Sequence, residues 1–143
     1  MANEDQLIAA YRATRFEAET LTGTLVLRIG ERSAPLAELL DRAALDCAAY
    51  LTAWNPQSVP QSEERNAIAH RHLVYEIESR AWPYFRGCGL DPSGDWSAEH
   101  SVLVLDMPVE DGCDIGRRFG QAAIVVAEAT ATPQLVWLGI ADA

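Results

Sequence analysis

The densest group of hydrogen-bonding side chains in the sequence surrounds the segment TAWNPQS at residues 52–58. Thr52, Asn55 and Ser58 belong to this segment, and a second asparagine, Asn66, follows in a stretch with helical periodicity. The apolar stripe of that helix predicts that Asn66 points inward, toward the end of the preceding strand. An inward amide needs partners, because leaving it unpaired costs about 1–3 kcal/mol.

Two interpretations of these amides stay open. In the first, both are structural: Asn66 bonds to the backbone of the Asn-Pro loop, and Asn55 closes an Asx turn before Pro56. In the second, Asn55, Asn66 and Ser58 line a polar pocket at the carboxyl end of a strand, where ligands commonly bind. The second interpretation predicts a small polar, or anionic, molecule as the ligand.

The loop DPSGDWSAEHS contains a second candidate group. Turn formation explains its Asp-Pro and Ser-Gly pairs, but it requires neither Trp96 nor Glu99. Glu99 and Ser101 alternate, so both point to one face of a strand. If that face is inward, the carboxylate needs a cation, and we expect Arg117 or Arg118 to supply it. Trp96 would offer a ligand a stacking surface.

The two arginines also have a structural interpretation, because cations in the last turn of a helix complement its dipole. Gln121, directly after the predicted helix stop at Gly120, adds one more amide at the start of a strand. Two other functions compete with ligand binding. Glu99 would act as general acid or base in a hydrolase or transferase, or the chain would be an acidic protein-interaction or inhibitor module.

Established catalytic and metal-binding patterns are missing from the sequence. It has no P-loop, no dinucleotide-binding fingerprint and no G-x-S-x-G motif. His70 and His72 are two apart in a helix and face different ways, so they cannot share one metal ion. Three cysteines form no C-x-x-C pair. We therefore predict neither a metal nor a cofactor.

The composition is that of a soluble, acidic protein. The net charge is −10, from 21 acids and 11 bases. Because nucleic-acid binding needs clustered basic residues, we expect no nucleic-acid partner. The acids are scattered, which favours a solvated surface. No apolar run is long enough to span a membrane, and the polar N-terminus does not resemble a signal peptide, so we expect a cytoplasmic location. The oligomeric state does not follow from composition.

Periodicity and turn residues predict one α+β domain over residues 1–143. We expect a mixed or mostly antiparallel sheet, with about three helices packed on one face and a further short helix in front. The expected helices are 4–14, a segment opening at Ser33, 62–80 and 108–119. The expected strands are two in a hairpin over 15–29, then 47–54, 81–87, 101–107, 122–129 and 133–141.

Four sequence motifs resemble a family of small uncharacterised bacterial proteins, known only as a domain of unknown function. They are AYRATRFEAE, TAWNPQS followed by an asparagine, GDWSAEHS and RRFGQAAIVV, and they cover nearly the whole chain. The family pattern is T-A-x-N-P-x-S, then Asn, W-x-E-x-S and F-G-Q-x-A-I. The resemblance implies that the family positions are Thr52, Asn55, Pro56, Ser58, Asn66, Trp96, Glu99, Ser101, Gly120 and Gln121.

The chain departs from that pattern at His100, where the family prefers proline, and at Ala122, where it often has asparagine. The resemblance therefore gives no role to position 122, and it carries no activity. The matching positions are polar or aromatic and lie at strand ends and in loops, rather than along apolar stripes. This distribution favours the pocket over a purely structural motif.

Overall fold

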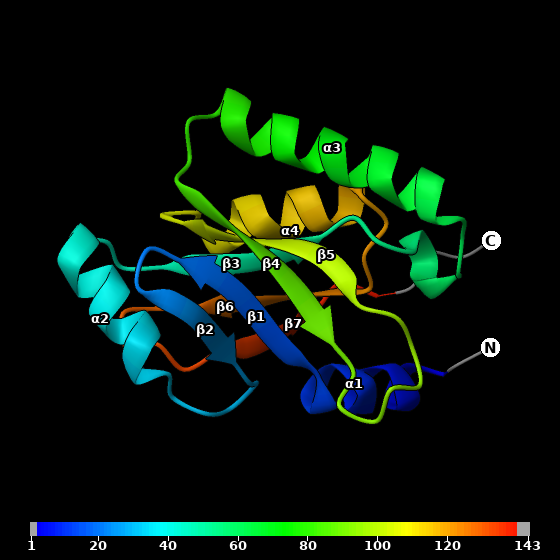
Figure 1. The fold of residues 1–143 in the computed structure, drawn as a ribbon, viewed down its shortest axis with the longest axis horizontal. Helices are drawn as coiled ribbons and strands as arrows, with labels where there is room; N and C mark the ends of the chain where they lie inside the picture. Colours follow the sequence, from blue (N-terminus) through cyan, green and yellow to red (C-terminus); the bar gives the residue numbers. More distant parts are fainter. Residues whose placement is uncertain (1–2, 140–143) are drawn as a thin grey trace.

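An antiparallel sheet of seven strands runs through residues 3–139, the part of the chain that the computed structural model describes (Figure 1). In chain order the elements are α1 (Glu4–Ala13), β1 (Arg15–Thr20), β2 (Gly23–Leu27), α2 (Ala34–Ala43), β3 (Ala48–Thr52), a short 3-10 helix η1 (Pro56–Ser58), α3 (Glu63–Ser79), β4 (Tyr84–Leu90), β5 (Glu99–Leu105), α4 (Val109–Arg118), β6 (Ala123–Ala127) and β7 (Gln134–Trp137). Across the sheet the strands follow the order β2-β1-β4-β5-β3-β6-β7, and every neighbouring pair is antiparallel.

The predicted α+β class and the predicted order of elements are confirmed. Residues 3–139 hold four α-helices rather than about three, because the helix expected in front is present as α1. The strand predicted at 81–87 is shifted, since β4 spans Tyr84–Leu90. Its glycines favour a loop by sequence but lie within the strand. Of the last predicted strand, 133–141, only Gln134–Trp137 is β7, and residues 140 and 141 lie outside the described residues.

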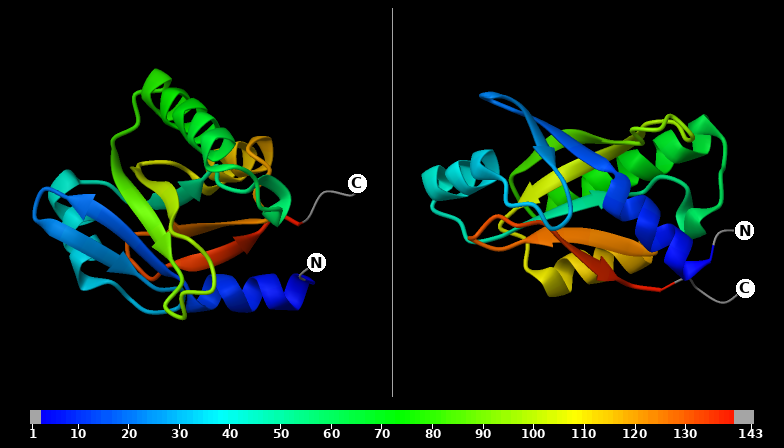
Figure 2. Two further views of the ribbon diagram at one scale, coloured as in Figure 1. Left: turned by 45° about the vertical axis from the view of Figure 1, so that its right-hand side comes forward. Right: turned by 90° about the horizontal axis from the view of Figure 1, so that it is seen from below.

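Helices cover both faces of the sheet, so the prediction that they pack on one face is wrong. Tyr11 of α1 and the buried leucines of α2 pack on one face, whereas α3 and α4 pack on the other; Figures 1 and 2 show the two groups on opposite sides. The sequence of the central strands explains why both faces are covered. All five residues of β6, the apolar run AIVVA, are buried. A strand that is buried at every position needs cover on both faces.

The ends of the helices form as their sequences predict. Ser62 caps α3 by accepting a hydrogen bond from the Arg65 N–H, and Glu63 and Glu64 lie in the first turn, where the helix dipole favours acids. Phe119 ends α4 just before Gly120, which has a φ of +70°. Within residues 3–139, no helix has both the length and the apolar character needed to cross a bilayer.

A hydrogen bond across the sheet shows how strongly the sheet curls. The Tyr50 hydroxyl, on β3, donates to the carbonyl oxygen of Glu17, on β1, at 2.7 Å. These strands are three steps apart in the sheet, which is about 14 Å if the sheet is flat, farther than a tyrosine side chain reaches. Gly87 of β4 lies beneath the contact, where a Cβ atom would collide with that carbonyl oxygen and lie 2.8 Å from the hydroxyl. Glycine therefore lets the sheet curl around Tyr50.

We predict that Tyr50→Phe lowers the free energy of unfolding by about 1–2 kcal/mol, because it leaves the partly buried Glu17 carbonyl without this donor. Chemical denaturation monitored by tryptophan fluorescence measures the effect. Tyr84→Phe is the matched control, since its hydroxyl donates to Glu78 at 3.0 Å in an exposed position, and we expect a change below about 0.5 kcal/mol. Equal losses for the two variants would contradict a special role for Tyr50.

Candidate functional site

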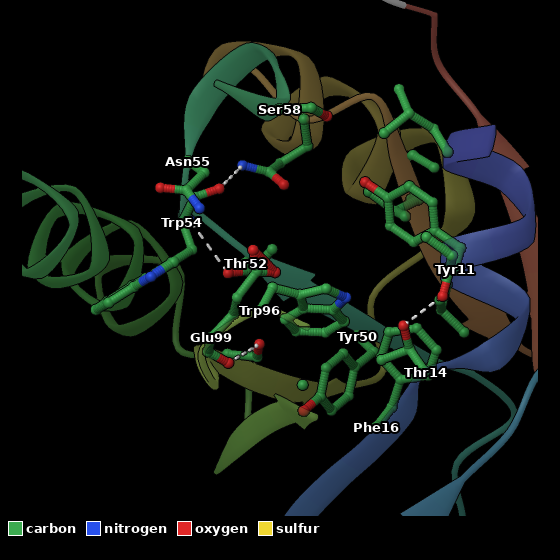
Figure 3. A pocket seen from close by; sticks show the side chains of 18 of the residues that line it. Tyr11, Thr14, Phe16, Tyr50, Thr52, Trp54, Asn55, Ser58, Trp96 and Glu99 are labelled. Atoms are coloured by element: carbon green, nitrogen blue, oxygen red, sulfur yellow. Dashed lines mark hydrogen bonds between the residues drawn. The ribbon is translucent and has the colours of Figure 1, made fainter. Parts of the chain in front are cut away.

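One cavity of about 250 Å³ opens beside α1, on the sheet face that α1 and α2 cover (Figure 3). It brings together seven of the ten predicted site residues: Thr52, Asn55, Ser58, Trp96, Glu99, Ser101 and Gln121. The other lining residues come from α1 and its C-terminal end, from the sheet and from the loop between β3 and α3: Leu7, Ala10, Tyr11, Thr14, Phe16, Tyr50, Trp54, Pro60, Gly89, Ala123, Ile124 and Val125. The cavity thus has one polar side and one largely aromatic and aliphatic side.

Asn66 does not line the cavity; it holds the loop that does. It is 2 % exposed. Its side-chain oxygen accepts from the backbone N–H of Asn55 at 2.8 Å and from the Gln61 amide at 2.7 Å, and its nitrogen donates to the Asn55 side-chain oxygen at 2.8 Å. Asn66 therefore makes the contacts that the structural interpretation predicts, with the Asn-Pro loop. The prediction that Asn66 lines the cavity is wrong. An inward amide at the start of α3 meets the Asn-Pro loop before it can reach the cavity.

The same network fixes which way the Asn55 amide points. Its side-chain oxygen accepts from Asn66 and also from the backbone N–H of Gln61 at 3.2 Å. An atom that accepts from a backbone N–H must be the oxygen, so the orientation follows from the bonding. The bond spans six residues, so the predicted Asx turn at Pro56 is wrong. Within residues 3–139, the Asn55 amide nitrogen has no hydrogen-bond partner, although Asn55 lines the cavity.

The loop after β3 has an unusual backbone that its neighbours stabilise. Asn55, Gln57 and Ser58 all have φ between +45° and +61°, a conformation that non-glycine residues rarely adopt and that clusters at ligand sites. The Gln57 N–H donates to the Gly120 carbonyl at 2.7 Å, and a Cβ atom at Gly120 would lie 2.9 Å from the Cβ of Pro56. Close backbone contact at this point requires glycine, which accounts for the F-G-Q motif.

Gln121 both supports this loop and lines the cavity. Its amide nitrogen donates to the carbonyl oxygens of Trp54, at 3.1 Å, and Phe119, at 3.2 Å. Two other polar lining residues are also engaged with backbone. The Thr52 hydroxyl donates to the carbonyl of His100 at 2.7 Å, and the Ser101 hydroxyl donates to the carbonyl of Glu99 at 2.9 Å. These three side chains therefore line the polar side of the cavity, but their donor groups are bonded to backbone carbonyl oxygens.

In the part of the chain that the structure describes, Glu99 is the one charged side chain of the cavity lining. It is partly buried, and within residues 3–139 its carboxylate has no hydrogen-bond or ion-pair partner. Burial raises the pKa of Glu99 to about 7 from its ordinary value of 4.5. The predicted alternation holds, since Glu99 and Ser101 line the same cavity from β5. A carboxyl group with a pKa near neutrality is suited to proton transfer or to binding a cation.

The predicted pairing of Glu99 with Arg117 or Arg118 is wrong. Arg118 donates to Glu76 of α3 at 2.9 Å, and Arg117 lies 3.8 Å from Asp114 in its own helix. Both arginines are exposed, and neither lines the cavity. The hydrogen bond from Arg118 holds the pKa of Glu76 below its usual range. The last turn of α4 faces α3 rather than β5, so the structural interpretation of these arginines describes their contacts.

Sequence reasoning missed the aromatic side of the cavity. Tyr11 and Phe16 come from α1 and β1, and Tyr50 comes from β3; Figure 3 shows their rings around the same open space as Trp96. Burial, aided by the charge of Glu99, raises the pKa of Tyr11 to about 12. Phe16 and Tyr50 pack edge to face, with ring centroids 5.2 Å apart. The sequence places Tyr11 on the apolar side of a helix, a position that does not distinguish a cavity wall from a core.

Trp96 reaches the cavity because Asp91 organises the loop before β5. One carboxylate oxygen of Asp91 accepts from the backbone N–H of Ser93 at 3.0 Å, and the other accepts from the N–H groups of Asp95 and Trp96 at 2.8 and 3.2 Å. The Ser93 hydroxyl also donates to the carboxylate, at 2.6 Å, and this bond, together with the backbone bonds, holds the pKa of Asp91 below its ordinary value. In the described part of the chain, the indole N–H of Trp96 has no partner. Among residues 3–139, no cluster of three His, Cys, Asp or Glu side chains is arranged to hold a metal ion.

The family model described as "Protein of unknown function (DUF3293)" matches residues 51–124. No curated protein and no solved structure matches the chain. The matched segment contributes the polar side of the cavity, from Thr52 to Gln121, together with Asn66, whereas α1 lies outside it. The predicted resemblance to an uncharacterised family is confirmed. Because residues 51–124 are more than half of the 143 residues, the chain belongs to the DUF3293 family.

Proposed function

We propose that the protein binds a small, partly aromatic molecule in the cavity beside α1. One observation carries this proposal. Three partly buried side chains of the cavity lining carry a polar group that has no partner within residues 3–139: the amide nitrogen of Asn55, the indole N–H of Trp96 and the carboxyl group of Glu99. Among the described residues, the fully buried side-chain atoms without a partner are Arg15 Nε and His70 Nδ1, so the three groups of the lining stay open to solvent and can be reached by a ligand in the cavity. A ligand with an acceptor for the two donors and a donor for Glu99 satisfies all three.

The dimensions of the cavity limit the size of the ligand. An apolar cavity of about 150 Å³ holds benzene. The volume of about 250 Å³ therefore suits a molecule with about ten non-hydrogen atoms by the same scale. Aromatic walls with a few polar groups are the usual lining of small-molecule sites. Among residues 3–139, no arginine or histidine lines the cavity, and the chain has no lysine. We therefore narrow the expected ligand to one without net negative charge.

The test uses the indole N–H signals of the four tryptophans in two-dimensional NMR spectra of the labelled protein. We expect neutral and cationic aromatic fragments to shift the signal of Trp96. The signals of Trp82 and Trp137, which do not line the cavity, should stay in place. Trp96→Phe assigns the reporting signal.

Two variants of α1 make the screen specific for the cavity. Ala10 is exposed and lines the cavity, whereas its neighbour Ala9 is exposed but does not line it. We predict that Ala10→Trp weakens fragment binding at least about tenfold, because the indole occupies part of a volume sized for about ten atoms, and that Ala9→Trp leaves binding unchanged. Fragments that bind the two variants equally, or no fragment that moves Trp96, would contradict the proposed function.

A second candidate function is supported by the Glu99 carboxyl group. A pKa of about 7 is the value at which a side chain serves best as general acid or base near neutral pH. In this case, a bound molecule would be converted, and Glu99→Gln would bind it without turnover. Mass spectrometry of each fragment hit after incubation with wild type and Glu99→Gln distinguishes catalysis from binding alone.

A further inference from the structure

We propose that the ligand of this cavity is an organic cation, such as a protonated amine, held between the carboxylate of Glu99 and the rings of Tyr11, Phe16, Tyr50 and Trp96. This inference rests on the proposed function and adds the chemical class of the ligand. Its basis is the combination of one acid, several aromatic side chains and no basic group in a single lining.

The charges around the cavity favour a cation over any other class. Within residues 3–139, Glu99 is the one charged member of the lining, and no arginine side chain lines the cavity. Arg15 of β1 pairs with Glu17 at 2.9 Å, and Arg118 pairs with Glu76. The net charge of −10 adds a negative field that raises the local concentration of cations. An ammonium group that reaches Glu99 gains a charge-assisted hydrogen bond, whereas a carboxylate ligand meets repulsion.

The aromatic side chains supply the second half of the site. The face of an aromatic ring carries negative charge density, so rings attract ammonium groups, and cages of several rings recognise them selectively. Two of these rings, and the backbone of a third residue, are held in place by their neighbours. The Tyr50 hydroxyl is anchored to Glu17, Phe16 packs against Tyr50, and the Trp96 backbone is bonded to Asp91. A cation entering the site therefore meets an organised wall.

Glu99 is also the group around the cavity whose titration would control binding between pH 6 and 8. Glu17 on β1, whose charge acts on the same Cys88 thiol as Glu99, is paired with Arg15. The uncharged titratable groups around Glu99 are Tyr11 on α1, Tyr50 on β3 and Cys88 on β4. Burial raises the pKa of each above its ordinary value, so all three stay neutral in this range. His100 follows Glu99 in sequence, but its ring lies against Trp54 and His70, with centroids 5.1 and 5.7 Å away. It serves as the control.

The test compares three probes that share a benzene ring but differ in charge: benzylammonium is positive, benzyl alcohol is neutral and benzoate is negative. Dissociation constants at pH 8 come from titration of the Trp96 indole signal. We expect benzylammonium to bind at least about tenfold more tightly than benzyl alcohol, and benzoate to bind more weakly than either. Glu99→Gln should remove the advantage of benzylammonium over benzyl alcohol, because the amide retains the shape but not the charge.

The pH dependence gives a second readout. Because the pKa of Glu99 is about 7, roughly a tenth of the carboxyl is ionised at pH 6, and benzylammonium should bind about tenfold more weakly there than at pH 8. Glu99→Gln should abolish this dependence, and His100→Gln should preserve it. Benzyl alcohol that binds as tightly as benzylammonium overturns the cation inference but leaves the proposed function intact. If none of the three probes moves Trp96 while other fragments do, the inference also fails; if no fragment does, the proposed function fails.

Discussion

Asn66→Ala is expected to lower the free energy of unfolding by about 3 kcal/mol. The substitution removes three hydrogen bonds and leaves the backbone N–H of Asn55 without its acceptor at 2.8 Å. An orphaned buried donor costs about 1–3 kcal/mol, and the deleted side chain of a residue that is 2 % exposed leaves a small void in addition. Urea denaturation measures the loss, and the melting temperature should fall by about 10 °C.

The control for this experiment is Gln61→Ala, which removes one of the three bonds from a partly buried residue and should cost about 1 kcal/mol or less. Hydrogen exchange gives an independent reading of the loop. In Asn66→Ala, the Asn55 amide should exchange at least about tenfold faster, because local opening no longer breaks a bond. A loss below about 1 kcal/mol with unchanged exchange would show that Asn66 does not hold the loop.

Glu99→Gln is expected to act in the opposite direction, raising the free energy of unfolding by about 3 kcal/mol at pH 8. The sign follows from the protons bound. The pKa of Glu99 is about 7 in the folded protein and about 4.5 in the unfolded chain. Between these values the folded state binds more protons than the unfolded state, so its stability falls as pH rises. The loss of folding stability caused by ionising Glu99 is complete above pH 7 and absent well below pH 4.5.

The measurement is the difference in unfolding free energy between wild type and Glu99→Gln at two pH values, which cancels the contributions of the other acids. This difference should shrink from about 3 kcal/mol at pH 8 to about 1 kcal/mol at pH 5. Glu31→Gln, at an exposed position, is the matched control and should show little change at either pH. A Glu99→Gln variant that is less stable than wild type at pH 8 would mean that an ionised Glu99 stabilises the fold.

Patterns within a single element predicted much of this site. The helical stripe placed Asn66 inward, and strand alternation placed Glu99 and Ser101 on one face. The partner of Asn66 was also predictable, because the loop it bonds lies only eleven residues away. In each case the deciding geometry spans one element or two adjacent ones, for which periodicity is a sufficient guide.

The contacts that the sequence did not predict join distant segments. Arg118 bonds to a residue 42 positions away, and the choice between Glu76 and Glu99 depends on how α4 packs against its neighbours. Tyr50 reaches Glu17 only because the sheet curls at Gly87. By sequence, a glycine at this position favours a loop rather than a strand. Tyr11 becomes a wall of the cavity through the docking of α1. Periodicity shows that a residue faces inward but not what it meets there.

The position of α1 has a consequence for how binding preferences evolve in such a fold. The helix closes one side of the cavity, yet none of its residues is fully buried, and it lies outside the segment that the family model matches. Replacements at Ala10 would alter the shape of the cavity at little cost to stability, since exposed positions tolerate change. Under this arrangement, the residues of α1 that line the cavity can change between related proteins while Glu99 and the polar loop after β3 are retained.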